Sequence, residues 1–173
     1  MSERAERLAA ELEEANGEVI AFAESCPAAV WTMPCVDDGR TVAAVVRHVG
    51  GAYIAHARLV QAAGAGEPIP AMFGDWATIH AGNAISAEKY AHADRGETIA
   101  SLRRNGANLA TAIRTLTDEQ LDRTAIVPIF DDAARTTEQI VEVPAIAHPL
   151  GHLVGLRATV AGQEEAPRSA SSA

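Results

Sequence analysis

Apolar residues recur every three or four positions in four long stretches of the chain, a spacing typical of helices that bury one face. The helices that this pattern predicts span 3–23, 42–63, 95–116 and, beginning at Thr136 or Thr137, a last stretch to about Ala161. The third helix has the most regular stripe, which consists of Ile99, Leu102, Gly106, Leu109, Ile113 and Leu116. Four helices of this length, joined by longer connections, predict an all-α protein with the fold of a four-helix bundle.

Polar residues with capping side chains mark where several of these helices begin. Thr41 is a suitable N-cap for the second helix. Asp94 with Glu97, and Thr117 with Gln120, have the three-residue spacing of a capping box. These signals predict the start of the third long helix and a short helical turn after it.

The connections are less regular than the helices. A helical stretch is predicted over about 83–92, and a short extended segment over 126–130 precedes the last helix, where Pro128 disfavours regular strand pairing. With 173 residues, the chain predicts one domain over 1–161. Residues 162–173 are mostly Ser, Ala, Gln, Glu and Pro, which predicts a mobile C-terminal tail.

Two prolines fall within the last predicted helix, and they allow two interpretations. If Pro144 and Pro149 lie inside the helix, each removes a backbone hydrogen bond and favours a kink. Alternatively, the helix begins near Pro144, because proline is favourable in a first turn. This segment is apolar on almost every side, so it is expected to be deeply buried.

Composition and charge exclude some classes of partner. Hydrophobic residues make up 48% of the chain but aromatic residues only 4%, and the abundant alanines favour closely packed helices. The net charge of −9 lacks the basic surface that a nucleic-acid-binding protein needs, and it disfavours anionic membranes. We therefore expect no nucleic acid and no membrane among the partners.

The two cysteines and the first residues indicate the compartment. Cys26 and Cys35 are expected to remain free thiols, since nothing else in the chain indicates secretion. The charged N-terminus has no apolar signal-peptide segment, and the apolar stretch 143–154 is too short to span a membrane. These features predict a cytoplasmic protein.

Three histidines carry the candidate chemistry. His148 and His152 are four residues apart, which places both side chains on one face of a helix. One divalent metal ion can bind both, and a catalytic site often has three protein ligands with an open fourth position. His48, on the inward stripe of the second helix, is the candidate third ligand.

Each histidine also has a simpler interpretation. His48 alone is more typical of a core histidine that is hydrogen-bonded to the protein, and two buried imidazoles do not require a metal. His56, two turns after His48, is a rival ligand for which we expect a place at the edge of the core or in the lining of a pocket. His80 and His92 are expected at the surface.

The early histidine in VAAVVRHVGGAYIAHARLV and the late HPLGH resemble the DinB-like superfamily. This superfamily includes YfiT-like proteins and the N-terminal domain of mycothiol-dependent maleylpyruvate isomerases, and the resemblance covers about 3–161. It implies a bundle with up-down-down-up helices, often a homodimer. It also implies a divalent metal, zinc or nickel, on His48, His148 and His152. Pro149 inside HPLGH departs from a plain helical motif.

The resemblance also implies a class of activity. Similar proteins are thiol-dependent transferases or isomerases that act on small electrophiles, with mycothiol or another low-molecular-weight thiol as co-substrate. The leading hypothesis is such an enzyme, and a metal-dependent hydrolase or a non-catalytic metal-binding stress protein are the alternatives. No catalytic acid or base is assigned; the candidates for the pocket are Tyr53, His56, Asp75, Trp76 and Arg157.

Overall fold

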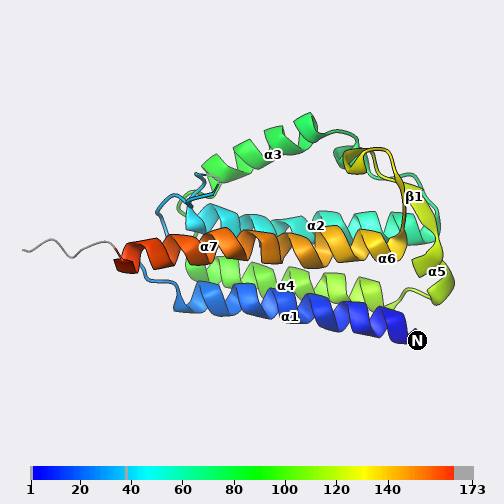
Figure 1. Cartoon of the computed structure of the whole chain (residues 1–173), viewed down its shortest axis with the longest axis horizontal. Coiled ribbons are helices and arrows are strands. Elements are labelled where there is room, and N and C mark those ends of the chain that lie inside the picture. The colour runs from blue at the N-terminus through cyan, green and yellow to red at the C-terminus, as the bar shows by residue number, and fades with distance from the viewer. Residues whose placement is uncertain (1, 38, 166–173) are drawn as a thin grey trace, which may run out of the picture.

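Four long helices lie side by side along the molecule, as predicted (Figure 1). The computed structural model describes residues 2–37 and 39–165. The bundle consists of α1 (Glu3–Ser25), α2 (Val42–Ala65), α4 (Arg95–Arg114) and a last helix made of α6 (Thr137–Ile140), the π-helix η3 (Val141–Ala147) and α7 (His148–Glu165). Figure 1 shows that α2 and α4 run in the same direction, opposite to α1 and α7, which is the up-down-down-up order.

The parallel arrangement of α2 and α4 requires a long connection that returns along the bundle. This connection contains the 3₁₀ turn η1 (Ala71–Phe73) and helix α3 (Trp76–Lys89). The α3 helix lies outside the bundle beside α2 (Figure 1). None of the α3 residues is buried, and the helix has no apolar stripe from which its start could be predicted. The sequence therefore predicted a start near residue 83 instead of at Trp76.

The capping residues begin their helices where the sequence predicts. The Thr41 hydroxyl accepts a hydrogen bond from the N–H of Ala44, and the carboxylate of Asp94 accepts one from the N–H of Glu97. Thr117 and Gln120 form a reciprocal capping box at α5 (Asp118–Asp122). Polar side chains thus satisfy N–H groups that the first turn of a helix leaves without partners.

The segment before the last helix differs from the prediction. Strands β1 (Thr124–Ile126) and β2 (Ala134–Thr136) form a short antiparallel hairpin. The expected extended segment, 126–130, lies mostly after β1, because Pro128 begins the 3₁₀ turn η2 (Pro128–Phe130). Pairing with β2 was missed, since strands of three residues leave no clear alternation.

The last helix contains both prolines, so it does not begin near Pro144. It begins at Thr137, where Thr136 and Gln139 form a capping box. Pro144 lies within η3, and the N–H of His148 donates to the carbonyl of Val143, five residues earlier. Proline has no backbone N–H to donate, and the helix accommodates Pro144 by widening locally into a π-helical turn.

The last helix is also less buried and longer than expected. Val154 is 71% exposed and Val143 45% exposed, so the expectation that this segment is deeply buried is wrong. The helix α7 continues to Glu165, four residues beyond the predicted end near Ala161. The remainder of the predicted tail, 166–173, lies outside the described residues.

The core lies mainly between α1, α2 and α4, where small residues let the backbones approach. A Cβ at Gly50 would lie 3.3 Å from the backbone nitrogen of Leu102, and one at Gly106 would lie 2.4 Å from Nδ2 of Asn16. That same Nδ2 donates to the carbonyl of Leu102. These glycines therefore permit close packing of the kind that alanine-rich helices favour.

Two remaining expectations concern thiols and membranes. Cys26 and Cys35 are both buried, and neither forms a disulfide. Among the described residues, we find no helix with the length and apolar character needed to cross a membrane.

Candidate metal centre

Three histidines, one from α2 and two from α7, lie close together. His48 lies on α2, His148 is the first residue of α7, and His152 follows one turn later. The Nε2 atom of His148 lies 3.2 Å from Nε2 of His48 and 3.2 Å from Nε2 of His152. One ring nitrogen from each residue lies within 4.8 Å of the other two. The structure therefore brings together the three histidines that the sequence singles out.

Pro149 does not separate the two histidines of HPLGH. The rings of His148 and His152 have centroids 4.6 Å apart and are nearly perpendicular, at 85°. Both residues lie in the regular α-helical part, and the π-helical winding ends just before them. Such π-helical segments inside α-helices are frequent at functional sites. Here the π-helical segment ends directly before the first of the two histidines.

The short contacts between imidazole nitrogens restrict what the cluster can bind. A ring nitrogen carries either one proton or one lone pair, so Nε2 of His148 cannot form two regular hydrogen bonds at once. A metal ion removes this conflict by accepting a lone pair from each ring. Nitrogen ligands of a tetrahedral zinc ion, with bonds near 2.0–2.1 Å, lie about 3.3 Å apart. The geometry of the three half-buried rings thus fits a divalent ion.

Burial keeps the central imidazole neutral. The pKa of His148 is lowered to about 2, first by desolvation and then by repulsion from His56, His152 and His48 when these rings are charged. A neutral imidazole has the lone pair that a metal ligand needs. Nδ1 of His148 is buried and has no hydrogen-bond partner among the described residues, whereas metal-bound histidines usually donate from this second nitrogen.

His56 lies beside the cluster without belonging to it. Its ring centroid is 5.4 Å from that of His148, and only 7% of the residue is exposed. Burial lowers the pKa of His56 to about 4, and its Nδ1 has no hydrogen-bond partner among the described residues. His56 also lines the adjoining cavity, so its expected place at the edge of the core or in the lining of a pocket is confirmed.

A cavity of about 790 Å³ adjoins the histidines, and His48, His56 and His148 contribute to its wall. The rest of its wall comes from α2, α3, η1, η2 and η3. The apolar lining residues are Ala52, Ile54, Ala55, Met72, Phe73, Trp76, Ile79, Ile129, Phe130, Val143, Pro144 and Ala147. The volume is in the range typical of small-molecule sites. A molecule bound here would contact apolar side chains along most of its surface.

The other candidates for the pocket have mixed outcomes. Trp76 lines the cavity, but Tyr53 is fully buried away from it, and burial raises its pKa well above the usual value. Asp75 caps α3, where its carboxylate accepts hydrogen bonds from Thr78. His80 and His92 are exposed, as predicted.

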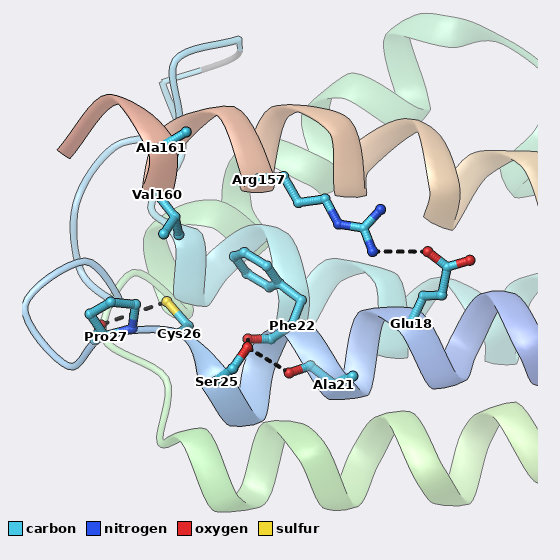
Figure 2. Close-up of a pocket in the computed structure, with 9 residues that line it drawn as sticks. All are labelled: Glu18, Ala21, Phe22, Ser25, Cys26, Pro27, Arg157, Val160 and Ala161. Atoms are coloured by element: carbon cyan, nitrogen blue, oxygen red, sulfur yellow. Dashed lines mark hydrogen bonds and ion pairs between the residues drawn. The ribbon is translucent and has the colours of Figure 1, made fainter. Parts of the chain in front are cut away.

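Arg157 lies at a different cavity, of about 440 Å³, between the ends of α1 and α7 (Figure 2). Its guanidinium forms an ion pair with Glu18 at 2.9 Å, and the thiol of Cys26 lies on the same wall. Burial raises the pKa of the Cys26 thiol, which keeps it protonated and poorly nucleophilic. This second cavity thus has neither the histidines nor an activated nucleophile.

Several residues of the main cavity were not recognised in the sequence. They include Arg47, Phe73, Tyr90 and Phe130. The position of Arg47 directly before the candidate ligand His48 is a local signal that it could lie near the site. Whether it lines a cavity depends on how the helices pack, which the sequence does not show. The aromatic residues come from connections with no periodic pattern, so their convergence could not be read from spacing.

Sequence comparison connects the chain to one family. Residues 12–143 match the family described as the mycothiol maleylpyruvate isomerase N-terminal domain. The matched segment contains His48 and ends before His148 and His152. No curated protein matches the chain in a comparison of sequences.

Two solved structures have a similar fold. One is YfiT from Bacillus subtilis, which is described as a probable metal-dependent hydrolase with an unusual four-helix bundle topology. Its TM-score is 0.74 and its sequence identity 18%, and the match covers 95% of this chain and 90% of YfiT. An uncharacterised protein from Clostridium difficile 630 has a TM-score of 0.72 and 17% identity, covering 96% and 99%. At these identities, the likeness establishes the fold.

Proposed function

Because the chain belongs to the mycothiol maleylpyruvate isomerase N-terminal domain family, we propose that it is a metal-dependent enzyme acting on a small molecule. His48, His148 and His152 are its metal ligands in this proposal. The ion is zinc or nickel, since imidazole nitrogen suits both metals. The reaction is the transfer of a low-molecular-weight thiol to a small electrophile, or an isomerisation that the thiol assists.

One observation carries this proposal. The three ring nitrogens lie within 4.8 Å of one another at the wall of a cavity large enough for a substrate. Three protein ligands leave a position open in a four-coordinate site, which is the arrangement of catalytic zinc. A site that serves only to store or sense metal does not need an adjoining apolar cavity.

The chain's own residues would prepare this reaction. The metal, when bound, would lower the pKa of a thiol that coordinates to it and make that thiol nucleophilic. His48, His148 and His152 fix the position of the ion at one wall, and the apolar residues of α3 and η2 exclude water from the electrophile. His56 remains uncharged near pH 7, because burial lowers its pKa to about 4, so it adds no charge that would repel the ion.

The proposal is tested by elemental analysis of the purified, untagged protein beside single-residue variants. We expect close to one equivalent of zinc or nickel in the wild type. His148→Ala and His152→Ala should each weaken binding by more than about 100-fold, because loss of an outer-shell partner alone costs 10–100-fold. His80→Ala, at an exposed histidine of α3, is the matched control and should retain the metal.

Activity assays then address the reaction. The metal-loaded protein is incubated with small electrophiles and with mycothiol, bacillithiol or glutathione. Loss of the free thiol reports transfer, and loss of the electrophile at constant thiol reports isomerisation. Turnover should need both metal and thiol, and should disappear in His148→Ala. A wild type that binds neither zinc nor nickel after reconstitution would overturn the proposal.

A hydrolase is the second candidate, and the likeness to YfiT favours it. In this case water takes the place of the thiol at the metal. The two candidates differ in one measurement, because hydrolysis would proceed at the same rate without any thiol. Turnover of ester or amide substrates in thiol-free buffer would support the hydrolase.

We also propose that the protein is a cytoplasmic homodimer with no nucleic-acid or membrane partner. Ile85 on α3 and Val154 on α7 are 70% and 71% exposed, and large apolar side chains at a surface favour association. Sedimentation velocity over a hundredfold range of protein concentration tests the dimer. A monomer at every concentration would contradict it.

A further inference from the structure

The charge in the main cavity is unevenly distributed. Among the described residues that line it, Arg47 is the only permanently charged side chain, and none is an aspartate or a glutamate. The rest are apolar residues, histidines, small polar residues and Tyr90. A charged group in apolar surroundings is costly unless a partner of opposite charge is present. The cavity therefore favours a ligand that brings a negative charge.

Other residues hold the Arg47 side chain in place without neutralising it. Its Nη1 donates to the hydroxyl of Ser101 on α4 at 3.0 Å, and its guanidinium carbon lies 4.7 Å from the centre of the Tyr90 ring. No carboxylate of a described residue forms an ion pair with it, and its Nε and Nη2 donate no hydrogen bond to a described residue. Arg47 thus retains N–H groups that can bind an anion in a forked geometry.

Two acidic residues line a neighbouring cavity, of about 440 Å³, whose wall also includes Arg47 and Tyr90. Asp94 and Glu97 line that cavity and do not line the main one. The Asp94 carboxylate accepts a hydrogen bond from the N–H of Glu97 at 2.8 Å, so Asp94 serves as the N-cap of α4. These acids therefore leave the side of Arg47 that faces the main cavity without a countercharge.

The rest of the wall of the main cavity suits the apolar part of a ligand. Phe73, Trp76 and Ile79 come from the η1–α3 connection, and Ile129 and Phe130 come from η2. Of these, Trp76 is 52% exposed, which leaves apolar surface available to a ligand. Burying such apolar surface on binding is favourable. An apolar chain or ring along this wall would supply affinity, while Arg47 would supply orientation.

We propose that the small molecule bound here is an amphiphilic anion, with a carboxylate or similar acidic group on Arg47 and an apolar body along α3 and η2. This inference rests on the proposed function, because it names the substrate class of that same site. Arg47, His48 and His148 all line this cavity, so an anion held by Arg47 shares the cavity with two of the three candidate ligands.

The test uses octanoate as the probe, with octan-1-ol and acetate as comparisons that lack the charge or the apolar chain. Dissociation constants are measured by calorimetry and by the fluorescence of Trp76, with Trp76→Phe as the check on the signal. All titrations are done on chelated, metal-free protein and repeated after zinc is added. Metal-free protein removes direct coordination of the carboxylate to an ion.

We expect Arg47→Gln to weaken octanoate binding by about 10- to 100-fold, since hydrogen bonds to charged groups contribute 1.5–3 kcal/mol. Binding of octan-1-ol should change less than twofold, and acetate should bind weakly to every variant. Arg47→Lys should recover part of the octanoate affinity. The matched control is Arg58→Gln, at an exposed arginine of the same helix, which should bind octanoate like the wild type.

Two results would overturn the inference. One is octanoate affinity that is equal in Arg47→Gln and wild type in the metal-free protein. The other is failure of the wild type to bind octanoate at millimolar concentration. Failure of the proposed function looks different, because the wild type would then bind no metal while the effect of Arg47→Gln on octanoate remained.

Discussion

Two consecutive glycines on α2 show how different its two sides are. A Cβ at Gly50 would lie 3.3 Å from the backbone nitrogen of Leu102, so this side of α2 is in close contact with α4. A Cβ at Gly51 would contact only the end of the Arg47 side chain, at 3.8 Å, and Gly51 lines the main cavity. One helix therefore has a closely packed side and an open side.

The difference indicates a division of roles. The closely packed side holds the fold, because α1, α2 and α4 bury their apolar stripes on one another. The open side has half-buried imidazoles, an arginine without an acidic partner, and a helix, α3, with no buried residue. Such features add little stability, and they persist because the packed side supplies it. Substitutions on the two sides should therefore affect different measurements.

The largest effect is expected from a leucine of the packed side. Leu109 on α4 is fully buried, so Leu109→Ala should lower the free energy of unfolding by about 2–5 kcal/mol. Ile79→Ala, on α3 at the cavity wall, should lower it by about 1 kcal/mol or less, since Ile79 is only half-buried. Urea unfolding of metal-free protein measures both values, and equal losses would contradict the division.

A pH dependence should arise from the open side. Folding lowers the pKa of His56 from 6.5 to about 4, because burial penalises its charged form. Between these pH values the unfolded chain binds more protons than the folded one, so stability falls as the pH falls from 6.5 to 4. The loss over this window should be about 3 kcal/mol from His56. Urea unfolding of the chelated protein at pH 7.5, 5.5 and 4.5 measures it.

A variant pair identifies the source of this loss. His56→Leu removes the titrating group, so its free energy of unfolding should fall less across the same window than that of the wild type. His148 also has a lowered pKa, so some loss should remain. His80→Gln, at an exposed histidine, should behave like the wild type. Identical pH profiles for wild type and His56→Leu would refute the assignment to His56.

The two sides also differ in how well the sequence predicts them. The stripe of Leu102 and Leu109 repeats at helical spacing, so the packed side follows from local periodicity. The convergence of His48 with His148 and His152 was also predictable, because an i,i+4 pair and an inward-facing histidine are local signals. A bundle then needs only to place the two helices side by side.

The rest of the open side depends on contacts between distant segments. The π-helical turn around Pro144 is a compromise between a missing N–H and helix packing, and the sequence left two interpretations open. The hairpin of β1 and β2 is too short for a readable alternation. Arg47 and Tyr90 are 43 positions apart, and only the return of the chain through α3 brings them together. Local patterns do not contain this information.

The smallest expected effect comes from the most direct test, in which glycine is replaced by alanine at each of two neighbouring positions in turn. Gly51→Ala should raise the free energy of unfolding by about 0.5–1 kcal/mol, because alanine favours a helix more than glycine and the new Cβ meets ordinary contact distances. Gly50→Ala has the same helical advantage, but its Cβ would press on the backbone of Leu102 and the hydroxyl of Ser101, so α4 must shift. Its free energy of unfolding should therefore fall below that of Gly51→Ala by more than about 1 kcal/mol. Thermal and urea unfolding, side by side, measure the difference. If both variants were equally stabilised, the two sides of α2 would be equally tolerant, and the contrast between a packed and an open side would not hold.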